Sequence, residues 1–181
     1  VKSSSCDERF IVEVGPGPGL LTNAILEKKI KKVLAIETDK TFLPILEELK
    51  EKHPKKFEFI INDALKVDLD KLISENYSVI SNLPYNISVP FIISLLIKEQ
   101  PVKWEKLTLT VQKEVADRMM AKINTKQYGR LSVLTQWRCR IKKICEIKPS
   151  CFIPPPKVIS TVISIETKKN ILTPSVENFQ K

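Results

Sequence analysis

The chain has 181 residues, enough for one substantial core, and its 43% hydrophobic and 28% charged residues are typical of a globular protein. A net charge of +9 favours contact with nucleic acid, although a solvated basic surface would explain it equally well. The four cysteines lack the paired spacing of a zinc site, and the single histidine, His53, cannot complete a ligand set. We therefore expect no metal, no membrane span, and a soluble cytoplasmic protein with reduced thiols.

Strand-like and helix-like segments alternate along most of the chain. The predicted strands cover residues 10–14, 33–36, 57–61, 79–83 and 107–111. The predicted helices cover residues 20–29, 40–52, 89–97, 113–122 and 131–137. Two late strands, near residues 141–147 and 158–165, have no helix between them and are expected to form an antiparallel hairpin.

This alternation predicts an α/β protein with an open, mostly parallel sheet and helices on both faces. In such sheets, ligands bind at the carboxyl ends of the strands. Glycine-rich or polar clusters lie at the carboxyl ends of four of the predicted strands, at Gly15–Gly19, Glu37, Asp63 and Asn82–Tyr85. The sequence therefore predicts a ligand site at this edge of the sheet.

The first cluster is the run Glu13-Val14-Gly15-Pro16-Gly17-Pro18-Gly19. Glycines let a ligand approach the backbone at the start of a helix, although a plain tight turn is the alternative. The spacing differs from the dinucleotide fingerprint, so a pyrophosphate is not required. Glu37, about 20 residues further on, stands where such folds bind ribose hydroxyls. Asp63 is either a contact to an adenine amine or an ordinary helix N-cap.

The segment Asn82-Leu83-Pro84-Tyr85 indicates the chemistry. Hydrogen bonds from an aromatic amine to the Asn82 amide oxygen and a backbone carbonyl would localise the lone pair of the nitrogen. Pro84 would fix the turn, and the Tyr85 ring would stack on a base. The alternative is a structural β-turn with a core tyrosine. With an activated methyl donor in the glycine turn, the two clusters together predict methyl transfer to a base.

The ordered set of motifs resembles the KsgA family of small-subunit ribosomal RNA adenine dimethyltransferases. The matching segments are Glu13–Thr22, Ile36–Asp39, Asp63–Ala64, Asn82–Ser88, Gln112–Val115, Tyr128–Val133 and Phe152–Val158. This resemblance implies a Rossmann-like class I methyltransferase fold and the cofactor S-adenosyl-L-methionine. It also implies dimethylation of two adjacent adenines near the 3′ end of small-subunit rRNA, in an immature subunit, by a monomer.

The same resemblance assigns the site residues. The cofactor-binding residues would be Gly15, Gly17, Glu37, Asp63, Ala64 and Asn82. The catalytic residues would be Asn82, Leu83, Pro84, Tyr85 and Phe152. Tyr85 and Phe152 would flank a flipped-out base.

Family members also carry a lid segment before the first strand and a helical C-terminal domain. We therefore expect residues 1–167 to form the methyltransferase domain without its N-terminal lid. Residues 168–181 are expected to be a linker towards a helical domain that this chain lacks.

Nine basic residues between the fifth and the last predicted strand are candidate phosphate contacts, a solvated face being the alternative. They are Lys113, Arg118, Lys122, Lys126, Arg130, Arg138, Arg140, Lys142 and Lys143. Two other functions share the fold: a large-subunit rRNA dimethyltransferase of the macrolide-resistance type, and a non-catalytic RNA-binding, assembly or mitochondrial transcription factor. The intact Asn82–Tyr85 segment favours a catalyst.

Overall fold

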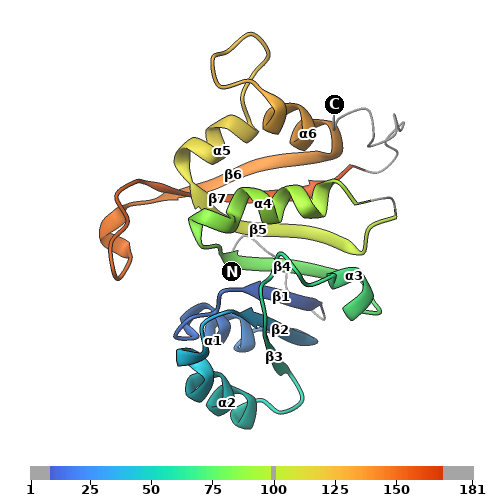
Figure 1. Ribbon diagram of the computed structural model, residues 1–181, viewed down its shortest axis with the longest axis vertical. Helices are drawn as coiled ribbons and strands as arrows, with labels where there is room; N and C mark the ends of the chain where they lie inside the picture. Colours follow the sequence, from blue (N-terminus) through green and yellow to red (C-terminus); the bar gives the residue numbers. More distant parts are fainter. Residues whose placement is uncertain (1–8, 99–100, 169–181) are drawn as a thin grey trace.

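A computed structural model describes residues 9–98 and 101–168 of the chain. In this part, seven strands form one sheet with the order β3-β2-β1-β4-β5-β7-β6 (Figure 1). The strands are β1 Phe10–Val14, β2 Lys32–Glu37, β3 Phe57–Ile61, β4 Tyr77–Asn82, β5 Trp104–Gln112, β6 Cys139–Ile147 and β7 Ser160–Thr167. Strands β1 to β5 pair in parallel, whereas β7 runs antiparallel to both β5 and β6. The predicted parallel sheet and late antiparallel pair are confirmed.

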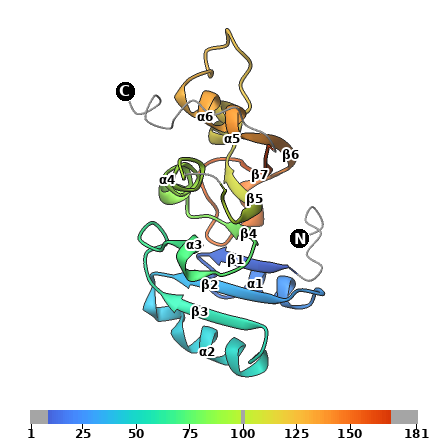
Figure 2. The same ribbon diagram turned by 90° about the vertical axis from the view of Figure 1, so that its right-hand side faces the viewer.

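Helices cover both faces of the twisted sheet, as predicted (Figure 2). The α-helices are α1 Leu20–Leu26, α2 Leu43–Lys52, α3 Leu69–Leu72, α4 Tyr85–Leu96, α5 Lys113–Met119 and α6 Arg130–Arg138. Two short 3₁₀ helices, η1 Lys40–Phe42 and η2 Pro149–Cys151, complete the set in the described residues. Helices α1 and α2 pack in one core cluster, and α4, α5 and α6 pack in the other.

The two core clusters are filled by alternate residues of the same strands. In β1, Ile11 belongs to the cluster under α1 and α2, while Val12 belongs to the cluster under α4. In β2, Val33 and Leu34 divide in the same way. Because successive strand residues point to opposite faces, central strands covered on both sides must be apolar throughout. This explains why the sequence shows these strands as continuous apolar runs.

The largest difference from the predicted boundaries concerns α4. It begins at Tyr85 instead of Val89, and Pro90 lies inside it. Tyr85 therefore stands in the first helical turn, where its carbonyl oxygen accepts a hydrogen bond of 3.0 Å from the Ser88 hydroxyl. Helix α3 was not predicted, because four residues are too few to show a helical period.

The parallel strands all end at the same edge of the sheet, and the connection between β6 and β7 returns to that edge (Figure 1). Residues 82–85, at the end of β4, thereby line one cavity together with residues of the segment 152–156, which is far away in sequence. The predicted linker lies outside the described residues except for Lys168, as does the segment before Arg9. No helix among the described residues is both long and apolar enough to cross a membrane.

Candidate active site

The glycine turn after β1 has a backbone that only glycine adopts readily. Gly15, Gly17 and Gly19 have φ angles of +67°, +53° and +77°. In this left-handed region a Cβ atom meets the backbone. The Gly15 amide also donates to the Ile36 carbonyl at 2.9 Å, which ties the turn to the end of β2. Three of the five residues of this turn therefore carry no side chain.

Glu37, the last residue of β2, holds this turn from the other side. One carboxylate oxygen accepts the Gly17 amide at 3.1 Å, and the other accepts the amides of Thr38 at 2.8 Å and Asp39 at 3.0 Å. A carboxylate offers about four acceptor positions, so about one remains for a ligand hydroxyl. The structure thus places Glu37 where the sequence predicted it. Its bond to the glycine turn is an additional role that the sequence did not reveal.

Asp63 does not cap a helix, so the N-cap interpretation is wrong. Its Oδ1 accepts the Leu65 amide at 2.9 Å in a local turn, and the next helix begins only at Leu69. Its Oδ2 has no hydrogen-bond partner among the described residues. Ala64 is buried in the larger core cluster and lines a cavity of about 200 Å³ with residues of α3 and α4. These two residues do not line the cavity formed by Asn82.

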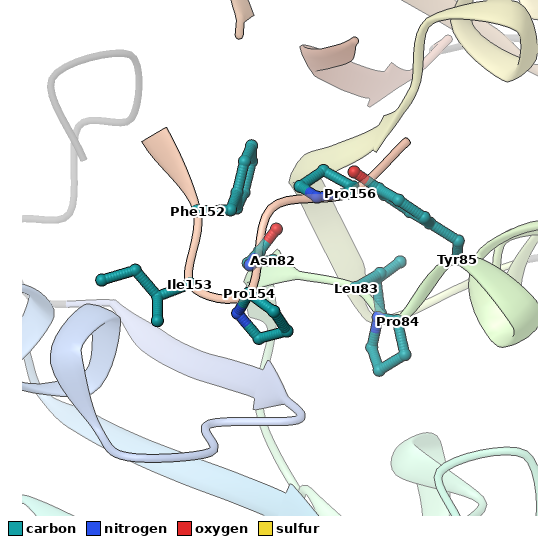
Figure 3. Close-up of a pocket in the computed structure, with 8 residues that line it drawn as sticks. All are labelled: Asn82, Leu83, Pro84, Tyr85, Phe152, Ile153, Pro154 and Pro156. Atoms are coloured by element: carbon teal, nitrogen blue, oxygen red, sulfur yellow. The ribbon is translucent and has the colours of Figure 1, made fainter. Parts of the chain in front are cut away.

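The five residues predicted to be catalytic line one cavity of about 290 Å³ at the end of β4 (Figure 3). Its walls are Asn82, Leu83, Pro84, Tyr85, Phe152, Ile153, Pro154 and Pro156. In Figure 3, the Phe152 ring lies beside Asn82, and the Tyr85 ring lies further along the cavity, beyond Pro156. The Asn82 side chain is exposed and makes no hydrogen bond with another described residue. The cavity therefore offers an open amide and two aromatic rings in its lining.

Tyr85 is fixed by a residue that the sequence analysis missed. Its hydroxyl lies 2.6 Å from the hydroxyl of Ser160, the buried first residue of β7. This bond connects α4 to the antiparallel part of the sheet. No sequence signal marked Ser160, since the partner of a strand residue depends on a register that the sequence does not show.

The glycine turn and the Asn82 cavity are in direct contact. A Cβ atom on Gly15 would lie only 3.3 Å from Cδ of Pro84. The Ser81 hydroxyl, one residue before Asn82, donates to the Val14 carbonyl at 2.5 Å. Strands β1 and β4 are thus fastened together just before the two turns. Ligands in the turn and in the cavity would be neighbours.

Glu13, the next-to-last residue of β1, has an environment that the sequence did not reveal. Its side chain is buried and accepts a hydrogen bond of 2.7 Å from the Thr22 hydroxyl. Burial raises the pKa of Glu13 to about 7, and the nearby Glu37 charge adds to the effect. The carboxyl beneath the glycine turn is therefore poised between its neutral and charged forms near neutral pH.

The predicted phosphate contacts divide into three groups. Arg138 is buried and donates to the carbonyls of Leu96 and Lys98, so its assignment as a phosphate contact is wrong. Lys113 and Lys143 both pair with Glu146, and Lys113 also pairs with Asp117. The other six are exposed and form no ion pair with a described residue: Arg118, Lys122, Lys126, Arg130, Arg140 and Lys142. In the described part of the chain, no acidic, histidine and cysteine side chains gather as a metal site.

A glycine turn with a buried carboxylate on the next strand, at the carboxyl edge of this sheet, defines the Rossmann-like class of folds that bind nucleotide-like cofactors. Within that class, the sequence profile described as "Ribosomal RNA adenine dimethylase" matches residues 2–181. The chain belongs to this family. The resemblance drawn from the sequence is thereby confirmed.

Curated relatives named "Ribosomal RNA small subunit methyltransferase A" include one from Rhizobium etli, 44% identical over 94% of the chain and 63% of that protein. Another, from Clostridium acetobutylicum, is 48% identical over 87% of the chain and 56% of that protein. The chain thus spans less than two thirds of these relatives.

Solved structures agree with the Rossmann-like methyltransferase fold. A dimethyladenosine transferase from Plasmodium falciparum superimposes with a TM-score of 0.77 at 30% identity, over 90% of this chain and 57% of that one. The 23S rRNA methyltransferase ErmE gives a TM-score of 0.81 at 23% identity, over 98% of this chain and 70% of that one. At that identity, the likeness to ErmE concerns the fold alone.

Proposed function

We propose that the full-length protein is an S-adenosylmethionine-dependent rRNA (adenine-N6,N6)-dimethyltransferase. It transfers methyl groups to the exocyclic amines of two adjacent adenines near the 3′ end of small-subunit rRNA, giving N6,N6-dimethyladenosines during ribosome biogenesis. One observation carries the proposal: the cavity between Tyr85 and Phe152 abuts the glycine turn through the contact of Pro84 with Gly15. An adenine amine in the cavity would face a methyl donor in the glycine turn.

The residues of the glycine turn fit S-adenosylmethionine. Gly15 and Gly17 leave the backbone accessible, and Glu37 keeps acceptor capacity for a ribose hydroxyl. The Oδ2 atom of Asp63 is available to an adenine amine. When bound, this cofactor would supply a methyl group already activated on a sulfonium.

The cavity residues then position the acceptor. The Asn82 amide oxygen and a backbone carbonyl of the turn accept the two N–H groups of the adenine amine. The nitrogen lone pair is thereby drawn out of conjugation with the ring and aimed at the methyl group. Tyr85 and Phe152 hold the base by stacking. Because an amide is not a base, this site accelerates transfer through positioning and electrostatics.

The partner that we propose is rRNA within an immature small subunit, bound by a monomer in the cytoplasm. Exposed Arg118, Lys122 and Lys126 supply charge for phosphate contacts outside the cavity. The described cysteines, Cys139, Cys145 and Cys151, are free thiols, as a reducing compartment requires.

The test uses the full-length protein with radiolabelled S-adenosylmethionine and small subunits that lack the modification, followed by mass analysis of the nucleosides. We expect label in N6,N6-dimethyladenosine of small-subunit rRNA. Matched large subunits are the control. Label in large-subunit RNA would favour the macrolide-resistance type of enzyme, and RNA binding without label would favour a non-catalytic factor.

A further inference from the structure

A second cavity, of about 370 Å³, lies beyond the wall of the Asn82 cavity. Pro156 lines the first cavity and Val158, two residues later, lines the second. The Tyr85 hydroxyl is bonded to Ser160, which pairs with Gln112 across β5 and β7, and Gln112 lines the second cavity. The two cavities have no lining residue in common, but they are linked through the segment 156–160.

The lining of the second cavity combines an apolar surface with free amides. Val158 and Ile159 are 41% and 39% exposed, although both are apolar. Ile159 is held in place because its carbonyl accepts the Lys113 amide at 2.9 Å. The side-chain amides of Gln112 and Gln127 have no hydrogen-bond partner among the described residues. A flat ring with donors and acceptors at its edge fits such a surface.

The charges of this cavity disfavour a phosphate. Its only cation among the described lining residues, Lys113, lies 3.0 Å from Asp117 Oδ2 and 3.2 Å from Glu146 Oε1. The lining also contains the exposed Glu114. A phosphate would meet two lining carboxylates and a cation that is already paired. An uncharged nucleobase meets no such repulsion.

We propose that this cavity binds the base of a nucleotide that flanks the target adenine. The inference rests on the proposed function, since it takes the Asn82 cavity as the site of the target base. The enzyme then holds two bases at once, one on each side of the wall formed by residues 156–160. Holding the flanking base fixes which adenine enters the first cavity.

The test is a thermodynamic cycle on RNA binding by the full-length protein. The probes are a small-subunit 3′-terminal RNA fragment and copies with an abasic nucleotide at each position flanking the target adenine in turn. Dissociation constants are measured by fluorescence anisotropy for wild type, Val158→Ser and Gln127→Ala. We expect one abasic position to weaken wild-type binding about tenfold and Val158→Ser to weaken binding to intact RNA about tenfold. Val158→Ser should bind the RNA with that abasic position no more weakly than wild type binds it.

Lys126→Ala, in the same loop as Gln127, is the matched control. An exposed lysine acts through phosphates and not through this base. The loss of RNA affinity in Lys126→Ala should therefore multiply with the loss of affinity caused by the abasic position. If the losses for Val158→Ser and Gln127→Ala also multiply, or if no flanking abasic position weakens wild-type binding, the subsite does not exist. Thermal unfolding verifies that each variant folds. Methyl transfer to intact RNA is measured separately. If the affinity losses do not multiply but no methyl group is transferred, the subsite is supported and the proposed function is rejected.

Discussion

Gly15 and Pro84 come from turns nearly seventy residues apart, yet a single added methyl group on Gly15 would press against the proline ring. Gly15→Ala also forces alanine to a φ of +67°. We expect a loss of stability of roughly 1–3 kcal/mol in urea unfolding and markedly weaker cofactor binding by calorimetry. Gly129→Ala is the control, because nothing lies within 4 Å of its Cβ position. Equal behaviour of the two variants would contradict the contact.

Asn82→Ala removes the exposed amide without disturbing the core. Methyl transfer should fall by roughly a hundredfold or more, since the loss of a positioned polar group at a reacting centre has effects of that order. RNA affinity and the unfolding midpoint should remain near those of wild type. Retained transfer would exclude Asn82 from the reaction.

Two substitutions of Tyr85 separate the contribution of its ring from that of its hydroxyl. Tyr85→Phe keeps the stacking face but leaves the buried Ser160 hydroxyl without its partner, so stability should fall by about 1 kcal/mol while kcat/KM changes little. Tyr85→Ala removes the stacking surface as well, and kcat/KM should fall by roughly five- to a hundredfold. If both variants lose kcat/KM equally, the hydroxyl and not the ring face would be the important group.

Glu13 predicts a pH dependence of stability. Its pKa is about 7 in the folded protein, against 4.5 ordinarily, so the folded state binds more protons than the unfolded state between these values. The contribution of Glu13 to stability therefore declines as pH rises from about 4.5 to 7 and is constant above that. Glu13→Gln should be more stable than wild type by up to roughly 3 kcal/mol at pH 8, and by much less at pH 5.

The measurement is urea unfolding of wild type and Glu13→Gln at both pH values. Exposed Glu47→Gln is the matched control and should follow wild type at each. An unchanged difference between Glu13→Gln and wild type at pH 5 and pH 8 would show that Glu13 does not titrate in this range.

Substitutions of Arg138 and Arg140 should distinguish an effect on stability from an effect on RNA binding. Arg138→Met leaves the carbonyls of Leu96 and Lys98 without their donor and should lower the free energy of unfolding by roughly 1–3 kcal/mol. Arg140→Ala, at an exposed position, should leave stability unchanged and reduce the salt dependence of RNA binding. Unfolding and anisotropy titrations at two salt concentrations distinguish the two effects.

The sequence predicted the strands well because the central strands are apolar on both faces. It also indicated which residues meet at one edge of the sheet, because Gly15 follows β1, and Glu37 and Asn82 are the last residues of β2 and β4. It failed where a role depends on tertiary geometry. Nothing in the sequence marks Ser160 as the partner of Tyr85, the neutralising environment of Glu13, or the burial of Arg138. Of the two alternatives for Asp63, the helix cap is wrong because the chain turns there and begins its helix six residues later.

The cavity around Asn82 draws four of its walls from residues 82–85 and the other four from residues 152–156. During synthesis, the glycine turn and strands β1 to β5 emerge from the ribosome well before the second set of walls exists. A nascent chain ending before Phe152 would possess one half of the cavity only, and Tyr85 would lack the anchor at Ser160. The Asn82 cavity is therefore among the last parts of the described chain to form, after the glycine turn and strands β1 to β5 have been made.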